Sequence, residues 1–104
     1  MPDDEACCSR CGRTFSEADF VACIAARIMG DACTDCYYWC AACGVYTVRL
    51  YRDVFVGEET AHGSEPISRE EGERRLGLIR SCENPGDDRC HCKAHLEYFG
   101  GWVD

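Results

Sequence analysis

The sequence has little that suits a membrane protein, a secreted protein or a nucleic-acid-binding protein. No apolar run approaches the roughly 20 residues that cross a bilayer. The first residues, 1–5, are acidic and polar, whereas a secretory signal begins with a basic segment and an apolar run. Clustered lysine and arginine, which phosphate backbones and anionic membranes attract, are missing from a chain of formal net charge −8. We therefore expect a cytoplasmic, acidic protein with no nucleic-acid partner and no membrane partner.

Motifs of catalysis are equally scarce. The chain has no Gly-rich phosphate loop, no HExxH sequence and no nucleophile motif. The spacing Cys36-x3-Cys40-x2-Cys43 is that of a radical-SAM cluster, but that chemistry sits on a large α/β barrel, which 104 residues cannot form. The sequence therefore gives little support for an enzyme.

Cysteine is what the sequence has in excess, with 11 in 104 residues. A chain of this length forms one domain with a modest apolar core, so we expect a single domain over residues 1–104 that is held together by cross-links or metal. An odd number of cysteines, an acidic N-terminus and repeated C-x2-C spacing all favour metal over disulfides. We therefore predict a small metal-binding domain.

Apolar spacing, caps and turns predict an α+β fold with zinc knuckles, a β-hairpin and two to three short helices. Ser16 and Asp19, followed by apolar residues at helical spacing, predict a helix over 17–29. Ser68 and Glu71 form a capping box that predicts a helix over 69–81. The other expected elements are a metal-binding loop at 31–44, strands at 45–51 and 53–56, an exposed loop at 57–66, a turn at 84–87 and a helix at 89–99.

Two segments share the form C-x2-C-G. Two thiolates separated by two residues can chelate one ion from a tight turn, and the glycine that follows accepts the positive φ that such a turn often requires. This pattern is typical of a zinc knuckle. We therefore predict one tetrahedral Zn²⁺ site made by both knuckles, with the ligands Cys8, Cys11, Cys40 and Cys43.

A second pair, Cys33 and Cys36, needs two more ligands from elsewhere in the chain. Cys92 and His95 are three residues apart, so on a helix they project from one face. We therefore predict a second Zn²⁺ site that joins these two pairs. Cys90 and His91 are rival ligands, Cys7 is an alternative to Cys8, Cys82 is either a buried thiol or a ligand, and Cys23 is interpreted as an inert buried thiol.

The order of these four pairs, with the first joined to the third and the second to the fourth, resembles the treble-clef and cross-brace zinc domains of the RING, FYVE and PHD type. The resemblance implies an interleaved topology for the two sites. It implies no activity, because Ser9 and Arg10 stand where a ubiquitin-ligase RING carries the apolar residue that docks its conjugating enzyme. A zinc ribbon followed by an independent second site is the competing topology.

The function that these features favour is a zinc-stabilised protein-protein interaction module or an accessory subunit of a larger complex. An iron-sulfur protein for electron transfer or redox sensing is one alternative, with a cluster held by Cys33, Cys36, Cys40 and Cys43. A RING-like ubiquitin-ligase module is another. The aromatic residues Tyr37, Tyr38 and Trp39 either cover the metal sites as part of the core or form an exposed patch for a protein partner.

Overall fold

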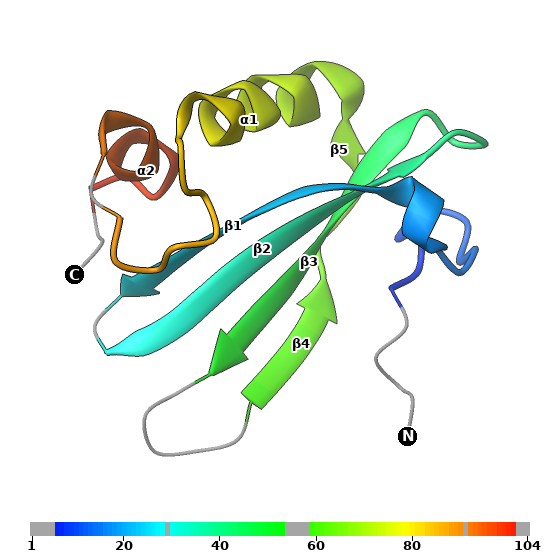
Figure 1. Ribbon diagram of the computed structural model, residues 1–104. Helices are drawn as coiled ribbons and strands as arrows, with labels where there is room; N and C mark the ends of the chain where they lie inside the picture. Colours follow the sequence, from blue (N-terminus) through cyan, green and yellow to red (C-terminus); the bar gives the residue numbers. More distant parts are fainter. Residues whose placement is uncertain (1–5, 29, 54–58, 91, 102–104) are drawn as a thin grey trace.

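The computed structural model describes residues 6–28, 30–53, 59–90 and 92–101. They form an α+β fold, as predicted, in which two helices cover one face of an antiparallel sheet (Figure 1). The strands lie in the order β1-β2-β3-β4, and β5 pairs with β3. Along the chain the elements are a 3₁₀ turn η1 (Glu17–Asp19), β1 (Phe20–Ile28), β2 (Asp31–Cys40), β3 (Val45–Asp53), β4 (Glu59–Gly63), β5 (Ile67–Ser68), α1 (Arg69–Ser81) and α2 (Lys93–Tyr98).

The first predicted helix, 17–29, is wrong, because most of this segment is β1. The predicted capping residues do interact, since Asp19 Oδ2 accepts from the backbone N–H of Ser16 at 2.8 Å, but they stabilise only η1. The apolar positions include the β-branched residues Val21, Ile24 and Ile28, which favour a pleated strand. Pairing with β2 along the length of the strand therefore overrides the helical spacing.

The predicted metal-binding loop at 31–44 is instead mostly a strand, because its first ten residues form β2 and the rest is the turn that leads into β3. β2 pairs with β1 on one side and with β3 on the other, so it lies inside the sheet. Only the tip that joins β2 to β3 is a turn, and it carries Cys43 and Gly44. The dense cysteines of this segment are therefore spread along a strand.

The strand predicted at 45–51 is confirmed as β3, which continues to Asp53. The strand predicted at 53–56 falls on residues 54–56, which lie outside the described residues. The loop predicted at 57–66 is wrong for its central part, because residues 59–63 form β4 and pair with β3. A polar composition does not exclude an outer strand, since the backbone bonds of β4 to β3 depend little on side-chain polarity.

The helix predicted at 69–81 is confirmed as α1. Ser68 caps it, because its side chain accepts from the backbone N–H of Glu71 at 3.2 Å. Gly72, which weakens a helix, has a packing role here: a Cβ at this position would lie 2.1 Å from a ring carbon of Tyr46. The helix packs on the sheet through a core of Ile24, Tyr37, Tyr46, Val48, Leu76 and Ile79.

The segment between α1 and α2 runs along the outer edge of β1 (Figure 1). The backbone N–H groups of Ala25 and Arg27 donate to the carbonyl oxygens of Pro85 and Asp88, at 2.7 Å and 3.1 Å. Arg27 also forms an ion pair with Asp88 at 3.0 Å. The turn predicted at 84–87 is present within this segment, and the helix predicted at 89–99 is shorter and forms α2.

Candidate metal centres

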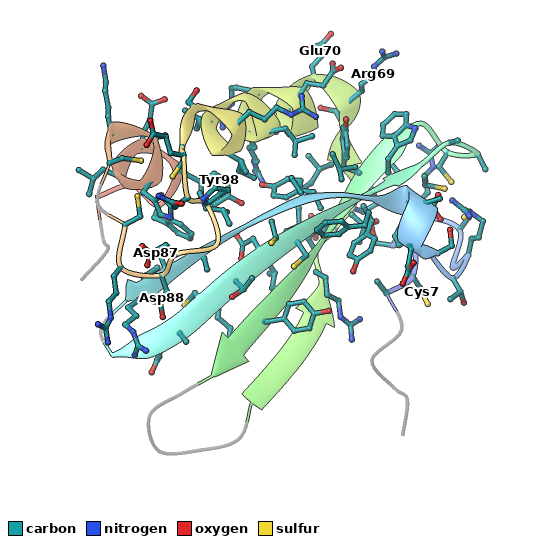
Figure 2. The ribbon with its side chains drawn as sticks, viewed as in Figure 1. Cys7, Arg69, Glu70, Asp87, Asp88 and Tyr98 are labelled. Atoms are coloured by element: carbon teal, nitrogen blue, oxygen red, sulfur yellow. The ribbon has the colours of Figure 1, made fainter. Side chains whose placement is uncertain are left out.

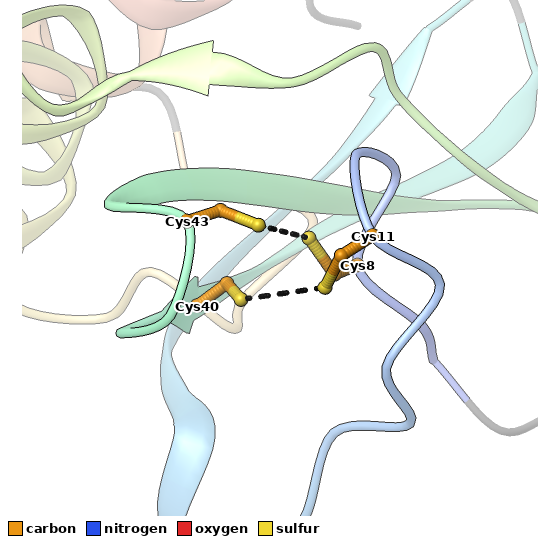
Figure 3. A group of neighbouring side chains, drawn as sticks. All are labelled: Cys8, Cys11, Cys40 and Cys43. Carbon is orange, nitrogen blue, oxygen red and sulfur yellow. Dashed lines mark hydrogen bonds between the residues drawn. The ribbon is translucent and has the colours of Figure 1, made fainter.

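Four cysteines from two distant segments converge at one end of the sheet (Figure 3). Their sulfur atoms all lie within 4.8 Å of one another, and the distances Cys8 Sγ–Cys43 Sγ and Cys11 Sγ–Cys40 Sγ are both 3.9 Å. A tetrahedral zinc ion with Zn–S bonds of about 2.3 Å requires S···S distances of about 3.8 Å. We call this set the N-terminal group: Cys8, Cys11, Cys40 and Cys43.

The two turns that carry the N-terminal group have the same backbone hydrogen bond. The N–H of Gly12 donates to the carbonyl oxygen of Cys8 at 2.8 Å, and the N–H of Gly44 donates to that of Cys40 at 2.7 Å. Both glycines have a positive φ, 80° and 67°, which other residues adopt only with strain. The repeated C-x2-C-G sequence therefore specifies two equivalent turns that face each other.

The first turn is anchored to the sheet by polar contacts. The backbone N–H and the hydroxyl of Ser9 lie 3.1 Å and 3.0 Å from Oγ1 of Thr47, whose side chain is buried in β3. Phe15 donates from its backbone N–H to the carbonyl oxygen of Ala6, which closes a small hairpin around the turn. These contacts hold Cys8 and Cys11 beside the β2–β3 turn.

The environment of the N-terminal group favours thiolates at two positions. Backbone N–H donation from Cys43 lowers the pKa of Cys40 to about 6. The pKa of Cys8 is lowered as well: burial raises it, but backbone N–H donation from Cys11 and Arg10 outweighs that effect. Because a metal binds the thiolate form, these hydrogen bonds prepare Cys40 and Cys8 to ligate a cation.

A second group lies where α1 ends and α2 begins. Cys82 Sγ is 3.6 Å from Cys90 Sγ and 3.2 Å from His95 Nδ1, and Cys92 Sγ is 3.7 Å from the same nitrogen. A tetrahedral zinc ion requires about 3.8 Å between two sulfurs and about 3.5 Å between sulfur and nitrogen. We call this set the C-terminal group: Cys82, Cys90, Cys92 and His95.

Helix ends place the ligands of the C-terminal group. Cys82 is the residue at which α1 ends, and Cys92 is the N-cap of α2, where its sulfur accepts from the backbone N–H of His95 at 3.5 Å. The fully buried His95 lies one turn into α2, and its Nε2 donates to the carbonyl oxygen of Ala25 at 2.8 Å. This hydrogen bond assigns the proton to Nε2 and leaves the Nδ1 lone pair free for a metal.

The structure brings together most of the ligands predicted from the sequence, but Cys82 takes the place of the predicted pair Cys33 and Cys36. The four cysteines of the two C-x2-C-G turns meet, and so do Cys90, Cys92 and His95. The partner of these last three is Cys82 and not the pair Cys33 and Cys36. The rival ligand His91 lies outside the described residues, and Cys7, the alternative to Cys8, contacts Thr14 Oγ1 at 3.8 Å and is not in the group.

Cys33 and Cys36 are separated from the C-terminal group because β2 is extended. Side chains three positions apart on a strand point to opposite faces of the sheet, so this pair cannot chelate one ion. In register, Cys33 lies opposite Ala26 of β1, and Cys36 lies opposite Cys23. Their C-x2-C spacing therefore lacks the turn that makes such a pair a chelator.

Cys82 is the ligand that the sequence pattern indicated only weakly, because it has no C-x2-C partner. The available signal was closeness along the chain, since Cys82, Cys90, Cys92 and His95 all fall within residues 82–95. A tight turn at Asn84–Asp87 then folds the chain back between the first ligand and the others. Local clustering was therefore a better guide to this group than pair spacing.

Two further findings concern membrane-spanning helices and similarity to known proteins. Within the described part of the chain, neither helix has the length and apolar character needed to cross a membrane. No protein-family model, no curated protein and no solved structure matches this sequence.

Proposed function

We propose that each group binds one Zn²⁺ ion and that both ions are structural. The observation that carries this proposal is that each group brings four ligand atoms, thiol sulfurs and in one group an imidazole nitrogen, within 4.8 Å of one another. Four protein ligands leave no open position for water or substrate, which is the property of a structural site. The two C-x2-C-G turns would then act as a pair of zinc knuckles.

The position of each group supports a structural role. The N-terminal group joins the hairpin at residues 6–15 to the β2–β3 turn. The C-terminal group joins the end of α1 to the start of α2, and through His95 it is tied to β1. The buried clusters are small, so metal bonds at these two places supply cross-links that the apolar core does not.

The iron-sulfur alternative loses its predicted ligand set. Cys33 and Cys40 are seven residues apart on one strand, which separates their Cα atoms by roughly 23 Å at about 3.3 Å per residue. The donor atoms of both observed groups are also spaced for a single ion, whereas a cluster of several irons separates its thiolates further. Zinc, or one iron bound by the N-terminal group, remains compatible with this geometry.

The resemblance to cross-brace domains is limited to ligand chemistry. The ligands of the N-terminal group all precede those of the C-terminal group, so the two sets follow each other along the chain and do not interleave. This order matches the competing topology of a knuckle-based site followed by an independent second site. The ligase alternative therefore has no topological support.

We infer that the chain acts as a protein-protein interaction module or accessory subunit. Charge supports this, because two cysteine-rich zinc sites would take the net charge from −8 to about −11, which opposes nucleic acid. The three consecutive aromatic residues do not form an exposed patch: Tyr37 is in the core, Tyr38 packs beside Cys8 and Cys40, and Trp39 packs on Tyr46. The three residues together are therefore not the interaction surface, and only Tyr38 contributes to the surface described next.

The best surface is an aromatic hollow near the N-terminal group. Tyr38 stacks on Phe15 with ring centres 5.1 Å apart and meets the edge of Phe20, which is 42% exposed. Glu17 adds a negative charge at the rim. A basic protein segment that carries one apolar anchor side chain would complement both the rings and the overall charge.

Two experiments test this function. Metal analysis and absorption spectra of protein purified without oxygen should give two colourless zinc ions per chain, and iron in place of zinc would contradict the metal assignment.

A photocrosslinking amino acid at position 20 should link the chain to one discrete partner in an extract of its source cells. The same probe at Leu96, the other large apolar side chain that is well exposed among the described residues, is the control. Equal crosslinking from both positions would argue against the hollow.

A further inference from the structure

Two cysteines outside the metal groups lie side by side on the neighbouring strands β1 and β2. Cys23 of β1 lies directly opposite Cys36 of β2 in the antiparallel register. The neighbours of Cys36 along the strand, Asp35 and Tyr37, both contact Tyr98 of α2, which lies between that helix and the sheet (Figure 2). Because side chains alternate along a strand, Cys23 and Cys36 lie on the face that the helices do not cover.

The spacing of this pair suits a covalent link. Directly opposite residues of antiparallel strands have Cβ atoms about 4.5–5.5 Å apart, and a disulfide needs them to approach to about 3.5–4.5 Å. Their Cα atoms, at about 4.5–5.5 Å, fall within the range of about 4.4–6.8 Å that a disulfide requires. Both side chains are partly exposed, so a small reagent has access to them. The pair needs little backbone movement to become a disulfide.

The two thiols are also electronically distinct. The Cys36 thiol donates a hydrogen bond to the sulfur of Cys23, which lowers the pKa of Cys23 to about 6. The same hydrogen bond, with burial and the nearby charge of Asp35, raises the pKa of Cys36. The hydrogen bond therefore favours the thiolate at Cys23, and a pKa near the ambient pH is favourable for an attacking thiolate.

A cation lies next to this pair. Arg49 of β3 is directly opposite Cys36, so Cys23, Cys36 and Arg49 form a row across three strands. Its Nε is buried and has no hydrogen-bond partner among the described residues, while its guanidinium lies 6.0 Å from the ring centre of Tyr51. The ion pairs of the described residues do not include Arg49, so its guanidinium beside the two thiols can bind a carboxylate of an incoming molecule.

We propose that Cys23 and Cys36 form a thiol-disulfide exchange site for small anionic disulfides such as glutathione disulfide, separate from both metal groups. Cys36 is four residues from Cys40, or roughly 13 Å along β2, and Cys23 is two residues from Ala25, which His95 contacts; both cysteines lie outside the two groups. The site is thus a redox site on the face of the sheet that the helices do not cover.

The exchange proceeds in two balanced steps. The Cys23 thiolate attacks one sulfur of the small disulfide, the S–S bond breaks, and one small thiolate leaves and takes up a proton. Cys36 then loses its proton to water and attacks the Cys23 sulfur, which expels the second small thiolate, also protonated on release. Two electrons pass from the cysteine pair to the small disulfide, Cys36 supplies one of the two protons and solvent supplies the other, and a Cys23–Cys36 disulfide remains.

The test uses the full metal-loaded chain and glutathione disulfide. After reaction, free thiols are alkylated and the protein is digested with trypsin; Cys23 is then the only cysteine of peptide 14–27, while Cys36 lies in peptide 28–49. We expect these two peptides to be joined through Cys23 and Cys36 with both metal ions retained. Reduced Cys23 after full reaction, a link to another cysteine, or metal release before the link forms would each overturn the proposal.

Variants separate the roles of the two thiols. Cys36→Ser should stop the reaction at a mixed disulfide of Cys23 with glutathione, and Cys23→Ser should abolish both products. Cys33→Ser, on the other face of β2, is the matched control and should leave the reaction unchanged.

Arg49→Lys and Arg49→Gln distinguish charge from packing. The glutamine variant alone should slow reaction with glutathione disulfide several-fold, and neither variant should slow reaction with a neutral hydroxyethyl disulfide. Equal loss with both disulfides would overturn the role of Arg49.

Discussion

His95 Nε2 donates to the backbone carbonyl of Ala25 at 2.8 Å, which joins the C-terminal group to a strand 70 residues earlier in the chain. The same hydrogen bond fixes the tautomer that leaves Nδ1 for the metal. His95→Ala should therefore remove one ligand, lower the zinc content from two ions to one and reduce the melting temperature.

His95→Cys separates metal ligation from the hydrogen bond to Ala25. It restores a ligand atom but cannot reach Ala25, so the zinc content should return to two while metal affinity falls by roughly 10–100-fold. Competition with a chelator of known affinity measures this fall. A cysteine variant that binds as tightly as the wild type would show that the hydrogen bond to Ala25 plays no part in holding the metal.

Cys40→Ser should remove one zinc ion and most of the thermal stability, because the ligand is fully buried and joins the two turns of the N-terminal group. Cys33→Ser changes a similarly buried cysteine of the same strand that belongs to neither group. It should retain both ions. Metal analysis of the purified variants, together with thermal denaturation, distinguishes the two outcomes, and unchanged zinc in Cys40→Ser would refute the N-terminal site.

Gly72→Ala should destabilise the protein, although alanine is the better helix former. The added Cβ would meet the Tyr46 ring at 2.1 Å, and overpacking of this kind costs about 1–3 kcal/mol. Gly77→Ala is the control on the same helix, because a Cβ added there would have nothing within 4 Å. That substitution should stabilise α1 by up to about 1 kcal/mol. Chemical denaturation measures the change in the free energy of unfolding for each variant, and the two changes should have opposite signs.

Tyr98 should make the protein sensitive to alkali. Burial raises its pKa above the ordinary value of about 10, and the nearby Asp35, which accepts from the Tyr98 hydroxyl at 2.9 Å, adds to the shift. In the unfolded chain Tyr98 loses its proton near pH 10, whereas in the folded chain it retains it, so the free energy of unfolding falls as the pH rises above about 10.

Tyr98→Phe removes the titrating group and the hydrogen bonds of its hydroxyl to Asp35 and Tyr37. Near pH 7 the variant should be less stable than the wild type by about 1–2 kcal/mol, because Asp35 loses a donor while its ion pair with Arg52 at 3.1 Å stays. This gap should narrow above pH 10, where only the wild type carries the Tyr98 penalty. Urea denaturation at pH 7 and at pH 11 measures both values, and a gap that widens with pH would contradict this account.

The parts of the fold that the sequence predicted correctly are those with strong local signals. The capping box of Ser68 and Glu71 located α1, and the two C-x2-C-G turns located the N-terminal group. β1 was mistaken for a helix because its apolar residues satisfy helical spacing, whereas its β-branched content and its pairing with β2 decide the outcome. Pairing between strands is a long-range property that a local pattern does not contain.

The second group shows the same limit. Cys33 and Cys36 have chelate spacing, but spacing has meaning only on a turn, and this pair lies on a strand. Cys82 lacks a C-x2-C partner and becomes a ligand only because the turn at Asn84–Asp87 and the cap of α2 bring the later ligands back to it. Backbone geometry therefore decided which cysteines meet.

The segment that runs beside β1 has a consequence for solubility. Residues 85–88 occupy backbone hydrogen-bonding positions of β1 that would otherwise be open to a strand from another molecule, and this segment is bounded by Cys82 and Cys90. A metal ion in the C-terminal group would clamp both ends of this cover. Loss of such an ion would uncover a strand edge open to pairing with another molecule, so metal binding would protect the protein from self-association as well as from unfolding.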